Sequence, residues 1–119
     1  MVRTLTPAQV SELLATTEVD VVDVRESSEW ATGHVPGARL VPLAELQAHP
    51  EAHLKDKTSP VLFVCAAGVR SQTAARLAAS LGVSQVFNLS GGTRAWVKAG
   101  QLLETPASVQ GASELALAV

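Results

Sequence analysis

The 119-residue sequence contains a single cysteine, no tyrosine, two phenylalanines and two tryptophans. One cysteine cannot form a disulfide within the chain, so nothing indicates an oxidising compartment. So few aromatic side chains cannot build a platform on which nucleic-acid bases stack. Nine lysines and arginines against eleven aspartates and glutamates give a net charge of −2, and this balance lacks the basic excess typical of nucleic-acid binding. We therefore expect no nucleic-acid partner.

Long apolar runs are also missing. No run approaches the roughly 20 residues that a membrane-spanning helix needs, and the N-terminal segment has no apolar stretch typical of a signal peptide. We expect no membrane association and a cytoplasmic location. The length suits one domain built around a single core.

Short β-branched runs alternate with stretches of helical periodicity. Strands are predicted over residues 19–24, 38–43, 61–65 and 85–89. Helices are predicted from Pro7 onward, around residues 25–30, over 44–54 with an interruption or a new start at Pro50, over 71–81, and around 93–99. This alternation predicts an α/β fold with a parallel sheet and helices on both faces. Ligands of such folds bind at the carboxyl ends of the strands.

The first helix has a clear start signal. Thr6 can cap it, Pro7 suits the first helical position, and Gln9 has the spacing of a capping box. At the other end of the chain, residues 105–119 are rich in alanine and serine and lack a recognisable partner element. We expect a domain over residues 1–104 and a C-terminal tail over 105–119, whose apolar end could dock on the domain.

Cys65 ends an apolar strand and opens a six-residue loop that leads into a helix. A thiol at this junction faces the unpaired N–H groups and the positive dipole end of that helix, which favour the thiolate. Ala66, Ala67 and Gly68 are too small to fill a core, but they let the backbone wrap around an anion. Arg70 adds a positive charge, so the loop suits anionic sulfur or phosphorus chemistry. The alternative is that Cys65 is only a small buried hydrophobe.

Four ordered motifs carry a resemblance to a known family. They are Asp23-Val24-Arg25 with Glu29-Trp30, then Gly33-His34-Val35-Pro36-Gly37-Ala38, then the loop Cys65-Ala66-Ala67-Gly68-Val69-Arg70-Ser71, and finally Asn88-Leu89-Ser90-Gly91-Gly92 with Ala95-Trp96. Together they resemble the rhodanese (sulfurtransferase) family over nearly the whole chain up to Gly100. The length resembles that of single-domain members.

The resemblance implies a five-stranded parallel sheet and a ping-pong sulfur transfer. Cys65 is the expected nucleophile, which takes a sulfur from a small anionic donor such as thiosulfate and carries it as a persulfide. Cyanide in assays, or a thiol or a protein in the cell, then accepts that sulfur. Neither a cofactor nor a metal is implied.

The remaining site residues follow from the loop and the motifs. Backbone N–H groups of Ala66, Ala67, Gly68, Val69 and Arg70 are expected to bind the substrate, and the Arg70 guanidinium suits its sulfonate oxygens. Supporting roles are expected for Asp23, Arg25 and Ser71.

The same residues leave several alternatives open. Cysteine-dependent phosphatases place five residues between cysteine and arginine, whereas this loop places four, which disfavours a phosphatase. Arg25 and Glu29 stand four residues apart and are expected to form a structural ion pair. His34 suits a hydrogen bond within a turn. A non-catalytic rhodanese-like module, or a persulfide carrier that serves a partner protein, is the alternative function.

Overall fold

The computed structural model describes residues 1–106 of the chain. In these residues a five-stranded parallel sheet has the order β1-β5-β4-β2-β3. Its strands are Val2–Leu5 (β1), Asp20–Asp23 (β2), Arg39–Leu40 (β3), Val61–Val64 (β4) and Val86–Leu89 (β5). The helices are Pro7–Thr16 (α1), Ser27–Trp30 (α2), Leu43–Ala48 (α3), Pro50–His53 (α4), Val69–Ser80 (α5) and Gly92–Lys98 (α6). The predicted parallel α/β fold is confirmed.

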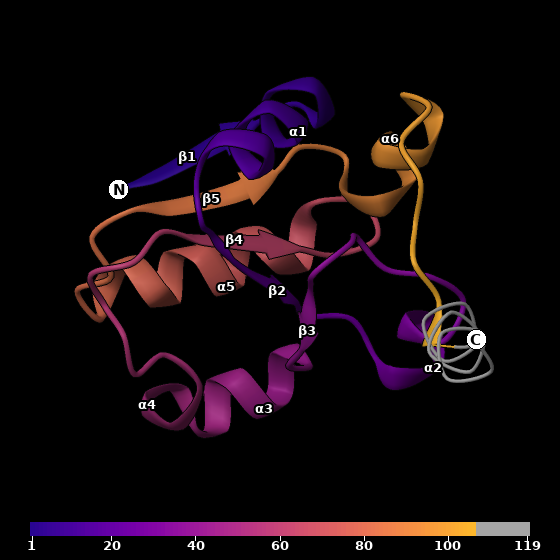
Figure 1. Cartoon of the computed structure of the whole chain (residues 1–119). Helices are drawn as coiled ribbons and strands as arrows, with labels where there is room; N and C mark the ends of the chain where they lie inside the picture. The colour runs from indigo at the N-terminus through magenta and orange to yellow at the C-terminus, as the bar shows by residue number, and fades with distance from the viewer. Residues whose placement is uncertain (107–119) are drawn as a thin grey trace, which may run out of the picture.

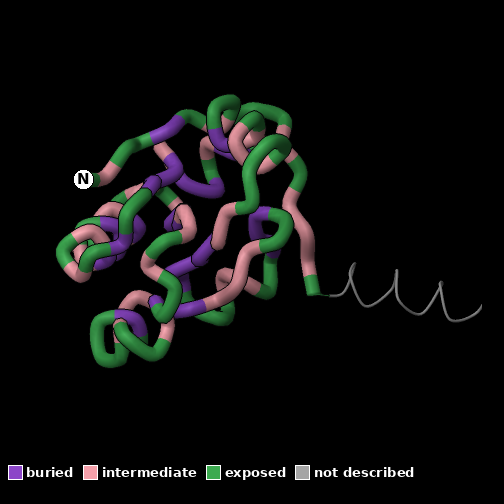
Figure 2. Tube along the Cα trace, turned by 60° about the vertical axis from the view of Figure 1, so that its left-hand side comes forward, coloured by how far each residue is buried: buried purple, intermediate pink, exposed green. Residues whose placement is uncertain are grey.

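Helices cover both faces of the sheet (Figure 1). On one face α5 and α3 pack on alternate strand residues, and this core includes Val22, Phe63, Leu46 and Ala75. On the other face α1 and α6 pack on the residues in between, with Val10, Leu62, Phe87 and Trp96 among them. The buried positions run through the middle of the molecule, and the exposed positions follow its outer turns (Figure 2). The strand β4 is entirely apolar and β5 is apolar except for Asn88, because both faces of these central strands are covered.

The strand β1 was not predicted from the pattern along the chain. It lies at an edge of the sheet, and only Leu5 of its four residues is buried. Arg3 and Thr4 interrupt the apolar pattern because an edge strand needs little burial. Its register, from Val2 opposite Val86 to Leu5 opposite Leu89, places it beside β5.

Helix starts agree with the residues that signal them. The Thr6 hydroxyl accepts a hydrogen bond from the Gln9 N–H, and the Gln9 side chain accepts one from the Thr6 N–H, so the predicted capping box is present. Pro50 opens α4 as a new helix after α3 has ended. The helix α5 begins at Val69, two residues before the predicted Ser71, because Gly68 already turns the backbone with φ +95°.

The chain folds back onto the domain after α6. The indole N–H of Trp96 donates to the carbonyl of Leu102, and His34 pairs with Glu104 through two backbone hydrogen bonds of 2.8 Å. The boundary after residue 104 stays a prediction. The apolar end of the expected tail lies outside the described residues. No helix within residues 1–106 is long and apolar enough to span a membrane.

Candidate active site

Cys65 lies at the carboxyl edge of the sheet, directly after β4, and only 1% of its surface is exposed. The loop that it opens leads into α5, and the ends of β2 and β5 flank it on either side. This is the edge at which parallel α/β sheets bind ligands. The sequence therefore predicted the place of Cys65 in the fold correctly.

The helix α6 holds the first part of this loop. The N–H of Thr93 donates to the carbonyl of Cys65 (2.9 Å), and the N–H of Arg94 donates to the carbonyl of Ala66 (3.1 Å). Since the C=O and N–H of a trans peptide point in opposite directions, the N–H groups of Ala66 and Ala67 face away from α6. The start of α6 thus sets the direction in which the loop presents its donors.

Gly92 permits this close approach. A Cβ at Gly92 would overlap the carbonyl of Cys65 and the backbone of Ala66. Its φ of +61° lies in the left-handed region that glycine adopts without strain. The Gly91-Gly92 pair of the sequence motif therefore places α6 against the loop.

Hydrogen-bond donors surround the Cys65 sulfur. The Gly68 N–H donates to Sγ at 3.0 Å, and the Ser71 Oγ lies 3.2 Å from it. Burial raises the pKa of the Cys65 thiol, but hydrogen bonds from Ser71 and from the N–H groups of Ala67 and Gly68 outweigh burial and lower the pKa below its ordinary value. A thiol with a lowered pKa is a stronger candidate for a nucleophile at neutral pH.

Asn88 completes the surroundings of the sulfur, although the sequence did not single it out as a functional residue. It lies on β5 beside β4, in register with Phe63. Its Oδ1 accepts a hydrogen bond of 2.6 Å from the Ser71 hydroxyl. Its Nδ2 donates to Gln72 Oε1 at 2.8 Å and to the Gly68 carbonyl at 3.3 Å. The available signal was an asparagine within an otherwise apolar strand, because a buried amide needs partners.

Arg70 forms an ion pair with Glu29 on α2. Its two terminal nitrogens lie 2.7 and 2.9 Å from the two carboxylate oxygens. The hydrogen bond from Arg70 is the main cause that lowers the pKa of Glu29 to about 2. The expected pair between Arg25 and Glu29 is wrong, because the structure gives each residue another partner. The guanidinium of Arg70 has five N–H donors, and donors beyond those used by Glu29 remain for a ligand.

Arg25 pairs with Asp23 instead, at the end of β2. Its Nε and Nη2 contact the carboxylate at 2.8–3.0 Å, and Nη2 also donates to the Gly33 carbonyl at 2.7 Å. Both side chains are almost fully buried. The arginine fork satisfies the buried carboxylate and ties the end of β2 to the turn that follows α2.

The turn after α2 carries the predicted hydrogen-bonding histidine. His34 is buried, its Nδ1 lies 3.2 Å from the Val35 carbonyl, and its ring stacks on Trp30 with centroids 3.6 Å apart. It belongs to the packing between α2 and the segment that follows α6. Trp96 is part of the core, as expected, whereas Trp30 is half-buried.

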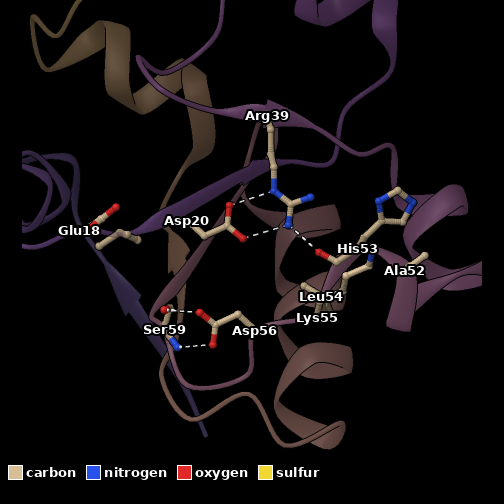
Figure 3. Close-up of a pocket in the computed structure, with 10 residues that line it drawn as sticks. Glu18, Asp20, Arg39, Ala52, His53, Leu54, Lys55, Asp56 and Ser59 are labelled. Atoms are coloured by element: carbon tan, nitrogen blue, oxygen red, sulfur yellow. Dashed lines mark hydrogen bonds and ion pairs between the residues drawn. The ribbon is translucent and has the colours of Figure 1, made fainter.

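A separate polar pocket of about 560 Å³ lies at the opposite edge of the sheet (Figure 3). Asp20 begins β2 there, opposite Val61 at the start of β4. Cys65 follows the other end of β4, roughly 13 Å further along the strand at about 3.3 Å per residue. Arg39 binds Asp20 through two contacts of 2.9 Å and also donates to the His53 carbonyl. Asp56 accepts hydrogen bonds from Ser59. These polar groups satisfy one another and tie β2, β3 and α4 together.

Within residues 1–106 no three histidine, cysteine, aspartate or glutamate side chains gather closely enough to hold an ion.

Comparison with known proteins yields one consistent family. The model of the rhodanese-like domain matches residues 6–99. The chain is 37% identical over 79 residues to the uncharacterized protein YqhL of Bacillus subtilis. This match covers 66% of this chain and 61% of YqhL. It is 33% identical over 92 residues to a protein named thiosulfate sulfurtransferase GlpE from Pseudoalteromonas translucida, covering 75% of this chain and 83% of that protein.

Two further similarities bear on function and fold. The chain is 32% identical over 78 residues to the putative sulfur carrier protein YrkF of Bacillus subtilis. This match covers 66% of this chain and 41% of YrkF. The crystal structure of a rhodanese-like domain protein from Staphylococcus aureus aligns with a TM-score of 0.71 and 30% identity, over 87% of this chain and 97% of that one.

Proposed function

This chain belongs to the rhodanese-like domain family, and we propose that it is a sulfurtransferase that carries sulfane sulfur as a Cys65 persulfide. The observation that carries the proposal is the set of groups around Sγ: the N–H groups of Ala67, Gly68 and Ser71 donate to it, and the Ser71 hydroxyl lies 3.2 Å away. The loop needs no general base, because its hydrogen bonds already favour the thiolate.

The proposed reaction has two displacement steps. In the first, the Cys65 thiolate attacks the outer sulfur of thiosulfate, the sulfur–sulfur bond of the donor breaks, and its electron pair leaves with sulfite. Cys65 then holds a persulfide whose negative charge lies on the outer sulfur. In the second, cyanide or a thiolate attacks that outer sulfur, and the electron pair of the breaking bond returns to Cys65 Sγ.

The loop stabilises the charge in both states. The N–H groups of Ala66, Ala67, Gly68, Val69 and Arg70 form the proposed ring of donors, and preorganised N–H groups stabilise developing negative charge without rearranging. The Arg70 guanidinium is proposed to contact the sulfonate of the donor with the donors that Glu29 leaves free. Asp23 and Arg25 support the loop by fixing the end of β2.

A persulfide carrier for a partner protein is the second candidate, and the similarity to a protein named as a putative sulfur carrier favours it. Both candidates need a reduced cysteine, which fits the proposed cytoplasmic location. A small anionic donor is common to both, whereas the acceptor differs: cyanide or a small thiol for the enzyme, and a cysteine of another protein for the carrier.

Intact-protein mass spectrometry tests the proposal. Thiosulfate should add one sulfur atom to the reduced protein, and cyanide should remove it with one equivalent of thiocyanate. The Cys65→Ala variant is the matched control and should gain no sulfur. A folded, reduced protein that forms no adduct would contradict both candidates, and an adduct that small acceptors do not discharge would favour the carrier.

A further inference from the structure

The Ser71 hydroxyl lies between two groups that need its hydrogen. Its Oγ is 2.6 Å from Asn88 Oδ1 and 3.2 Å from Cys65 Sγ. A serine hydroxyl has one hydrogen, and an amide oxygen has none to give. The short contact with Asn88 therefore uses the hydroxyl hydrogen of Ser71. A Cys65 thiolate also has no hydrogen, and besides the loop N–H groups it would accept that same hydrogen.

The amide of Asn88 is held in the orientation that creates this competition. The Gly68 carbonyl can only accept a hydrogen bond, so the Nδ2 of Asn88 faces it, and the Gln72 side chain accepts a second bond from Nδ2. Oδ1 is thereby turned towards Ser71. Cys65, Ser71 and Asn88 are all buried, so water does not replace any of these bonds.

We propose, resting on the function proposed above, that Asn88 is a positioning residue that competes with the Cys65 thiolate for the hydroxyl hydrogen of Ser71. In the thiol form all three groups are satisfied, because the Cys65 S–H donates to Ser71 and Ser71 donates to Asn88. In the thiolate form Ser71 must turn its hydrogen towards Sγ and leave Asn88 Oδ1 without it.

The persulfide restores the bond between Ser71 and Asn88. Its charge lies on the outer sulfur, so Sγ no longer needs the hydroxyl hydrogen and Ser71 can return it to Asn88. Asn88 therefore favours the thiol and the persulfide over the free thiolate. When an acceptor removes the outer sulfur and the electron pair returns to Sγ, this bond breaks again, so Asn88 slows discharge and preserves the loaded state.

The charged groups near the loop stay the same in the test. Arg70 faces it from α5 and is paired with Glu29, and the buried pair of Asp23 and Arg25 faces it from the end of β2. None of these residues is changed in the variants below, so their effects on the sulfur cancel in the comparison.

The experiment measures the pKa of the Cys65 thiol from the pH dependence of its alkylation by iodoacetamide, in protein without any sulfur donor. Cys65 is the only cysteine, so the rate reports on it alone. Asn88→Leu should lower the pKa by about half a unit to one unit, the size expected for one hydrogen bond released to the thiolate. Ser71→Ala should raise it.

The double variant identifies the route of the effect. In the Ser71→Ala background, Asn88→Leu should leave the pKa unchanged, because no hydroxyl hydrogen remains to compete for. Gln72→Ala is the matched control, since it removes a partner of Nδ2 and leaves Oδ1 in place. Asn88→Asp provides a second probe if the leucine variant does not fold, and it should raise the pKa more with Ser71 present than without it.

These results overturn or support the proposal without reference to catalysis. The proposal is contradicted if Asn88→Leu raises the pKa of the Cys65 thiol or leaves it unchanged. It is also contradicted if Asn88→Leu shifts this pKa equally with and without the Ser71 hydroxyl. If the protein forms no persulfide, the pKa measurements still stand and only the proposed function fails. If it forms one, cyanide should discharge the Cys65 persulfide of the Asn88→Leu variant about two- to threefold faster than that of wild type. The reason is that a thiol of lower pKa is the better leaving group.

Discussion

Arg70 in the cysteine loop and Glu29 on α2 are 41 residues apart in the sequence, yet their side chains meet through two contacts of 2.7 and 2.9 Å. This pair joins the start of α5 to the short helix after β2. It also gives the arginine two possible roles, since the same guanidinium can hold the loop in place and contact an anionic donor.

Substitution of the two partners separates these roles. Arg70→Ala should lower kcat/KM for thiosulfate by about tenfold to a hundredfold, because it removes a charge-assisted contact with a dianion. Glu29→Gln should lower it much less, because the arginine remains. Steady-state kinetics with thiosulfate and with an uncharged persulfide donor provide the measurement. Equal losses in both variants and with both donors would show that Arg70 acts only on the loop.

The acid stability of the protein should depend on Glu29. Its pKa falls from 4.5 to about 2 in the folded protein, chiefly because Arg70 donates a hydrogen bond to it. A group with a lowered folded pKa stabilises the protein above its unfolded pKa and loses that effect as pH falls through the folded value. Wild type should therefore resist urea better than Glu29→Gln at pH 6, and the difference should vanish between about pH 4.5 and pH 2. A difference that stays constant with pH would exclude this ion pair as its source.

Gly92→Ala should disturb the active-site loop. The added Cβ would overlap the Cys65 carbonyl, and the positive φ adds strain. We expect destabilisation of more than about 2 kcal/mol and a higher pKa of Cys65, since the loop N–H groups turn away from the sulfur. Gly100→Ala is the control, because its φ is +86° but nothing lies near its Cβ position. Similar stability and the same Cys65 pKa in both variants would show that α6 does not orient the loop.

Cys65→Ser should fold normally and lose sulfur transfer from thiosulfate to cyanide. A hydroxyl has nearly the shape of the thiol, but it is barely ionised at neutral pH and forms no persulfide. Thiocyanate formation measures the activity, and circular dichroism with thermal unfolding checks the fold. Turnover at the wild-type rate would contradict the proposed mechanism.

Truncation tests the expected boundary of the domain. Removal of residues 105–119 should leave activity nearly unchanged. Removal from residue 101 onward should lower the melting temperature by several degrees, because it also deletes the contacts of Leu102 with Trp96 and of Glu104 with His34. A loss of activity without unfolding in the shorter deletion would move the boundary beyond residue 104.

Much of the fold was predictable because its signals are local. Apolar runs with turn residues between them indicated four of the five strands, and Thr6, Pro7 and Gln9 marked the start of α1. The position of Cys65 at a strand end followed from the same pattern. These features depend on backbone geometry within a few residues, so the chain order alone carries them.

The partners of the polar side chains were decided by the tertiary structure. Arg25 could have paired with Glu29 on local spacing, but it binds Asp23, while Glu29 binds Arg70. Asn88 reaches Ser71 because the sheet order places β5 beside β4. Such pairings depend on which strands become neighbours and on which side chains are buried together. Desolvation then favours the partner with the best geometry, and no spacing along the chain encodes that choice.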